Sequence, residues 1–68
     1  MKNKKLIQLR KDKGLSQEAF ARLMGIALMT QYKVENGHIV ASRNYMDKLK
    51  EIYPDVSIDS LFFNTKQQ

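Results

Sequence analysis

The chain has 68 residues, a net charge of +5 at pH 7, one histidine and no cysteine. That length allows a single domain, and one histidine without cysteine cannot build a typical zinc site or a disulfide. No apolar run approaches the roughly 20 residues of a membrane-spanning helix, and no apolar segment typical of a signal peptide follows the basic start. We therefore expect a single-domain cytoplasmic protein with no metal and no membrane contact.

The positive charge is concentrated at one end of the chain. The first 13 residues carry a net charge of +5, whereas acidic residues outnumber basic ones between residues 44 and 63. The basic side chains of the first segment are Lys2, Lys4, Lys5, Arg10, Lys11 and Lys13. This asymmetry suits an anionic partner such as nucleic acid, although lysines that only solvate the surface give the same pattern.

Leucine spacing predicts a first helix over residues 4–13. Leu6 and Leu9 give it an apolar stripe, and Gly14 is a suitable end because glycine readily adopts the left-handed conformation. We expect Leu15 to be buried in the turn that follows.

A second helix is predicted over residues 17–24, with Ser16 as its N-cap. Phe20, Leu23 and Met24 have the i, i+3, i+4 spacing that is typical of an inward face. Gly25 ends this helix after two turns.

Three further helices follow in the prediction. One spans residues 28–35 and is closed by the Asn-Gly pair at 36–37. The next spans residues 43–53, between a capping Ser42 and Pro54. The last spans residues 58–63 and is capped by Ser57. No stretch shows the alternation of a strand, so we predict an all-α domain over residues 1–63 and a polar C-terminal tail at 64–68.

The second and third of these helices form a helix-turn-helix arrangement, because a tight glycine turn joins them. Ala21 is small where the two helices cross, and Gly25 permits the sharp turn. Ile26 is placed to fill the corner between the helices. The later helix then projects outward with dimensions that suit the major groove of DNA.

Three segments resemble the Cro/C1-type helix-turn-helix regulators, the group that includes lambdoid-phage repressors and Cro proteins. They are LSQEAFARLMGI at residues 15–26, VENG at 34–37 and PDVSIDSLF at 54–62. The resemblance extends over residues 6–62. It implies a compact five-helix lambda repressor-like DNA-binding domain, with the helix-turn-helix at its second and third helices.

The resemblance also implies which residues contact DNA. The recognition helix lies at 28–35, and Gln17 and Asn36 fall where family members contact backbone phosphate. The predicted DNA-contacting residues are Gln17, Ala27, Leu28, Met29, Thr30, Tyr32, Lys33, Asn36 and His38. For His38, an exposed loop position without a DNA contact is the simpler alternative.

Arg10 and Glu35 match a family pair that forms an internal ion pair between the first and third helices. That role is structural, and no DNA contact is implied for either residue. Breaking one partner of such a partly buried pair is costly.

The sequence departs from the family pattern in the recognition helix. Ala27 replaces the usual Ser or Thr cap, which weakens the helix N-terminus by about 1 kcal/mol. Gln31 stands where the family buries Ile or Val, so we expect either polar partners for its amide or a rotated helix. Polar base-reading groups are few, and we expect specificity to involve Leu28 or Met29 against thymine methyls, Tyr32, and DNA shape.

The last helix is unusually apolar for so small a chain. Phe62 and Phe63 point in different directions on a helix, so at least one of them is expected to be exposed in a monomer. We assign Ile58, Phe62 and Phe63 to a homodimer interface. A two-fold dimer reads two half-sites about 34–36 Å apart, whereas one helix reads only a few base pairs.

These observations predict a sequence-specific DNA-binding transcriptional regulator, most simply a Cro-like repressor that binds a palindromic operator as a dimer. The expected partner is double-stranded DNA. We expect no enzymatic activity, no cofactor and no small-molecule substrate. The alternative is an antitoxin or another protein-interaction module on the same fold, with the apolar C-terminus as its binding surface.

Overall fold

A computed structural model describes residues 2–63, and the regular structure in that range consists of five helices without strands. The helices are α1 (Lys4–Asp12), α2 (Gln17–Met24), α3 (Leu28–Glu35), α4 (Arg43–Ile52) and α5 (Ile58–Phe62). The predicted all-α class and the five helices are therefore confirmed, and α1, α4 and α5 each end one residue before their predicted ends. The predicted polar tail at 64–68 lies outside the described residues.

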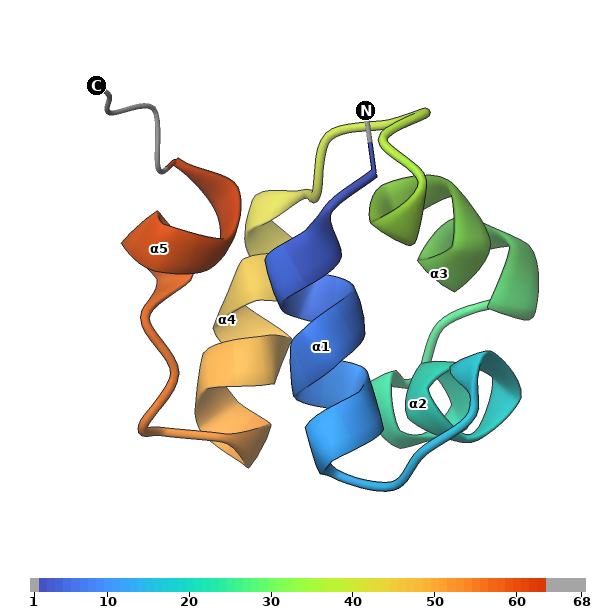
Figure 1. Cartoon of the computed structure of the whole chain (residues 1–68), viewed down its shortest axis with the longest axis horizontal. Helices are drawn as coiled ribbons and strands as arrows, with labels where there is room; N and C mark the ends of the chain where they lie inside the picture. The colour runs from blue at the N-terminus through green and yellow to red at the C-terminus, as the bar shows by residue number, and fades with distance from the viewer. Residues whose placement is uncertain (1, 64–68) are drawn as a thin grey trace.

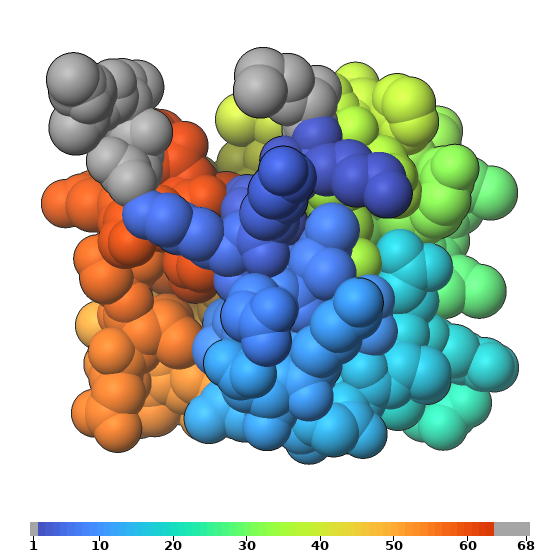
Figure 2. Space-filling model, viewed as in Figure 1, coloured from blue at the N-terminus to red at the C-terminus, as the bar shows by residue number. Residues whose placement is uncertain are grey.

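The helices are arranged around α1, which crosses the middle of the molecule (Figure 1). In the view of Figure 1, α4 and α5 lie to the left of α1, and α2 and α3 lie to its right. α2 packs against both α3 and α4, and α1 also contacts α3. This arrangement leaves the side chains of α2 and α3 at one edge of the molecule (Figure 2).

Local capping chemistry explains where the helices begin. The hydroxyl oxygens of Ser16, Ser42 and Ser57 each accept a hydrogen bond of 3.1 Å from the backbone N–H three residues later. Each bond satisfies one of the backbone donors that a helix N-terminus leaves unpaired. Gly25 has a φ of 72°, so the sharp turn between α2 and α3 uses the left-handed conformation that glycine permits.

The core lies where α1, α2, α3 and α4 meet. Its buried apolar side chains are Leu6, Phe20, Met24, Val34, Ala41, Tyr45 and Leu49. Half-buried side chains pack around this cluster, among them those of Leu15, Ile26, Ile58 and Leu61. Leu15 is thus only partly buried in its turn, and Ile26 lies in the corner between α2 and α3.

The prediction for Leu23 is wrong, because its side chain is 43% exposed. Phe20, Ala21 and Met24 are the buried residues of α2. At about 100° per residue, Ala21 completes the inward face on the opposite side of Phe20 from Leu23. The small alanine lets α2 approach the core along that side, and the turn of the helix carries Leu23 to the surface.

α3 begins without a side-chain cap, which gives the first testable prediction. Ala27 has the same extended backbone as Ser16 and Ser42, but it makes no capping hydrogen bond. We expect Ala27→Ser to raise the free energy of unfolding by about 1 kcal/mol, measured by urea denaturation. Ser16→Ala is the matched control and should lower it by a similar amount. An Ala27→Ser variant no more stable than the parent would show that α3 is not limited by its cap.

Candidate nucleic-acid interface

The outer side of α3 carries large exposed side chains. Leu28, Tyr32 and Met29 are all exposed, and Met29 is 60% accessible. Lys33 lies beside them and is also exposed. The opposite side of the same helix is buried through Gln31, Val34 and Glu35. The side of the helix that a partner can reach is therefore well defined.

An ion pair joins α1 to the end of α3. Arg10 Nε lies 2.7 Å from Glu35 Oε2, and Arg10 Nη2 lies 3.2 Å from Glu35 Oε1. The third guanidinium nitrogen, Nη1, donates to the carbonyl oxygen of Leu15 at 2.8 Å. Such a two-point contact fixes orientation as well as distance. The pair therefore holds α1, the α1–α2 turn and α3 in one arrangement.

Gln17 is attached to the same carboxylate from α2. Its Nε2 donates to Glu35 Oε1 at 3.0 Å, and its side chain is half-buried. An amide nitrogen carries two hydrogens, and this bond uses one of them. Gln17 thus lies at the start of α2 next to α3, and its direction is set by a protein contact.

Gln31 extends the network to α4. Its side chain has no exposed surface. Its Nε2 donates to Glu35 Oε2 at 2.6 Å, and its Oε1 accepts the hydroxyl hydrogen of Tyr45 at 2.7 Å. The buried amide has partners at both ends. Of the two expectations for Gln31, partners or a rotated helix, the structure has partners.

The network also fixes the protonation of its members. Burial by itself would raise the pKa of Glu35, but hydrogen bonds from Arg10, Gln31 and Gln17 hold that pKa below its ordinary value. Burial raises the pKa of Tyr45, so its hydroxyl keeps its proton at neutral pH. A charged acceptor and a protonated donor therefore lie at the two ends of the Gln31 side chain.

The remaining predicted contacts flank the C-terminal end of α3. Asn36 Nδ2 donates to the carbonyl oxygen of Tyr32 at 2.8 Å. His38 is exposed, and its ring centroid lies 6.0 Å from that of Tyr32. The backbone N–H of Asn3 donates to the carbonyl oxygen of Glu35 at 2.7 Å, which brings the basic N-terminal segment to the same place.

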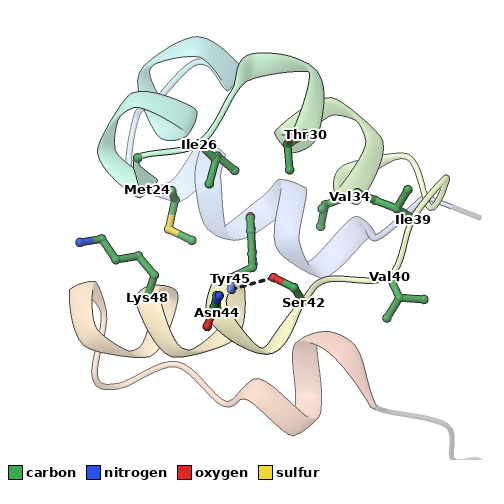
Figure 3. A pocket seen from close by; sticks show the side chains of 11 residues that line it. Met24, Ile26, Thr30, Val34, Ile39, Val40, Ser42, Asn44, Tyr45 and Lys48 are labelled. Carbon is green, nitrogen blue, oxygen red and sulfur yellow. Dashed lines mark hydrogen bonds between the residues drawn. The ribbon is translucent and has the colours of Figure 1, made fainter.

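Thr30 lies at the edge of the outer side of α3. It is half-buried and lines a mainly apolar cavity of about 410 Å³, which Met24, Ile26 and Val34 also line (Figure 3). Ala27 is exposed at the start of α3. The structure thus brings Leu28, Met29, Tyr32 and Lys33 together on one surface, and it places Thr30 at the edge of that surface.

The three predicted dimer residues differ in exposure. Ile58 and Phe62 are half-buried against the core, and the rings of Phe62 and Tyr45 meet edge to face at 6.1 Å. Phe63 is 53% exposed. Ile58 lines a hollow between α4 and α5, whereas Phe62 lines a different one beside the α3–α4 loop.

Two apolar residues of that loop were missed by the sequence reasoning. Val40 is 88% exposed and Ile39 is also exposed, and both line the same hollow as Phe62. The available signal was the pair of β-branched residues that follows the helix-ending Asn-Gly-His at 36–38. Such residues favour strands or cores, and here they have neither.

The sequence matches the model of a protein family described as helix-turn-helix over residues 6–61. The match covers most of the chain, which therefore belongs to this Cro/C1-type helix-turn-helix family. The family binds double-stranded DNA, and the chain is a DNA-binding transcriptional regulator. No match was found among curated proteins or among solved structures. Within residues 2–63, no helix has the length and apolar character needed to cross a membrane.

The buried network gives a second prediction. We expect Gln31→Leu and Tyr45→Phe each to lower the free energy of unfolding by about 1–3 kcal/mol, because each leaves a buried polar group without its partner. The double variant should be destabilised by less than the sum of the two single-variant destabilisations, by about 0.5 kcal/mol or more. Urea denaturation of the four proteins measures this coupling.

Ser16→Ala combined with Tyr45→Phe is the control for that cycle. The two sites share no hydrogen bond, so their effects should add. If the losses of unfolding free energy from Gln31→Leu and Tyr45→Phe were strictly additive, the hydrogen bond between Gln31 and Tyr45 would not couple α3 to α4.

Proposed function

We propose that the chain is a sequence-specific regulator, a Cro-like repressor, that binds a palindromic operator in the cytoplasm as a homodimer and inserts α3 into the major groove. The observation that carries this proposal is the division of α3 into a buried polar side and an exposed outer side. A helix whose rotation is fixed from within presents the same residues to every DNA site. Such a fixed presentation is what sequence recognition requires.

Base contacts are assigned to Leu28, Met29 and Tyr32 on the outer side of α3. The N-terminal part of a recognition helix usually reaches the base edges, and Leu28 and Met29 lie there. Lys33 lies in the last turn of α3, so we assign it to a backbone phosphate and not to a base edge.

Phosphate contacts are assigned to residues at the margins of α3. Gln17 and Asn36 each have an amide hydrogen left after their internal bonds. His38 and Lys2 are exposed near the C-terminal end of α3. Together they would contact the phosphates of the DNA backbone on both sides of the groove, which positions α3 without reading the base sequence.

Dimerisation is assigned to an apolar surface that joins the α3–α4 loop to the end of α5. Ile39, Val40 and Phe62 line one hollow, and Phe63 follows Phe62 at the end of α5; Val40 and Phe63 are the most exposed of the four. An exposed apolar surface of this kind typically marks a protein contact. The interface residues predicted from the sequence share Phe62 and Phe63 with this surface, and the third of them, Ile58, lines the hollow between α4 and α5.

Selection of binding sites from random duplex DNA at near-physiological salt tests this function. We expect a two-fold symmetric site with half-sites about one helical turn apart, bound by two copies of the chain. Enrichment of an asymmetric site would contradict the dimer. No enrichment, with only weak salt-sensitive retention, would contradict sequence-specific recognition and favour the protein-interaction alternative, including an antitoxin.

Lys33 gives a further prediction about the phosphate contacts. We expect Lys33→Ala to weaken binding about equally for the selected site and for unrelated DNA, and to reduce the slope of log affinity against log salt by roughly one per subunit. Titrations at several salt concentrations measure both effects. Lys50→Ala is the control, because Lys50 lies on α4 and lines the hollow between α4 and α5. A loss confined to the selected site would instead assign Lys33 to a base.

A further inference from the structure

We infer that α3 recognises the C5 methyl groups of pyrimidines, so that thymine or 5-methylcytosine is the feature that Leu28 and Met29 read in each half-site. This inference rests on the proposed DNA-binding function and specifies which groove chemistry the site takes. Three observations carry it: the exposed apolar residues of α3, the internal use of its amide groups, and the position of its one cation.

The residues that can reach a base edge are mainly apolar. At about 100° per residue, Leu28, Tyr32, Met29 and Lys33 follow one another around the outer side of α3. The first three are exposed, and Met29 is the most exposed of them at 60%. Neither Leu28 nor Met29 belongs to the core cluster or packs against it. Their burial against a partner therefore costs no internal packing.

The amide groups that commonly read adenine are engaged within the protein. Bidentate recognition of adenine needs a free amide donor and acceptor on one side chain. Gln31 is fully buried, and both ends of its amide are bonded to Glu35 and Tyr45. Asn36 is folded back onto the carbonyl oxygen of Tyr32, and Gln17 is held by Glu35. Gln31 therefore cannot reach a base edge, and Asn36 and Gln17 each have one amide hydrogen bound within the protein.

The charged groups that commonly read guanine or cytosine are also missing from the outer side of α3. The helix contains no arginine, and its single carboxylate, Glu35, is buried in the ion pair with Arg10. Lys33 is the only cation of α3 and lies in its last turn. What remains near the helix N-terminus is the aliphatic surface of Leu28 and the thioether of Met29.

The C5 methyl is the base-edge group that matches such a surface. In the major groove, thymine carries an apolar methyl group, and cytosine presents only an amine donor unless it is methylated at C5. Burial of one methyl-sized group changes affinity by roughly 4-fold. A symmetric dimer makes each contact twice, so one methyl position per half-site changes affinity by roughly 15-fold.

Deoxyuridine provides the direct test, because it keeps every hydrogen-bonding group of thymidine and lacks only the methyl. The probe is the duplex enriched in the selection described above, with each symmetric pair of thymines replaced in turn. We expect a loss of roughly 15-fold at one or two positions and little change elsewhere. In the converse arm, a cytosine at such a position should bind more weakly than 5-methylcytosine by a similar factor.

Variants show which side chains read the methyl. Leu28→Ala and Met29→Ala should each remove the preference for thymine over uracil at one position. Lys33→Ala should lower affinity while the preference stays intact. Equal affinity for thymine and uracil at every position of an enriched site would overturn the methyl inference and leave the DNA-binding function standing. Absence of any enriched site would overturn both.

Discussion

A single buried carboxylate sets the arrangement of the helix-turn-helix. Removing a carboxylate from water costs several kcal/mol unless charged and hydrogen-bonding partners surround it. Glu35 is 1% exposed, and its two oxygens accept hydrogen bonds from Arg10, Gln17 and Gln31. These donors come from α1, α2 and α3, and Tyr45 adds α4 through Gln31. Three helices therefore have to lie in one arrangement for this charge to be satisfied, and α4 has to lie against α3 for the Gln31 amide to keep its second partner.

The same network determines the chemistry of the outer surface. A typical surface helix buries apolar residues and exposes polar ones, whereas α3 buries Gln31 and Glu35 and exposes Leu28 and Met29. Partners on three neighbouring helices hold the polar pair inward, so the apolar pair has to face outward. The polar atoms that would read hydrogen-bonding groups in the groove are used to orient the helix. On the proposed mode of recognition, specificity would depend on DNA shape, methyl contacts and the few polar groups at the margins of α3.

Capping residues in the sequence predict where the helices begin, whereas contacts between helices are harder to predict from the sequence. Ser16 and Ser42 act within three residues of themselves, so their caps could be identified from the sequence alone. The bond between Gln31 and Tyr45 joins residues 14 apart, and it depends on how α3 and α4 pack. Spacing alone could not show that Ala21 would displace Leu23 from the inward face. The exposure of Val40 likewise depends on a loop path that no periodicity describes.

The composition of the core links folding to association. A domain of this size buries too little surface to be more than marginally stable, and two of its five largest fully buried side chains are Gln31 and Glu35. Such polar groups favour one arrangement over others more than they add stability. In the proposed dimer, Val40 and Phe63 would bury apolar surface that is exposed in the single chain. A second copy bound there would bind only the folded state, so its association would stabilise the fold. An operator with two half-sites would strengthen this coupling, because it holds both copies at once.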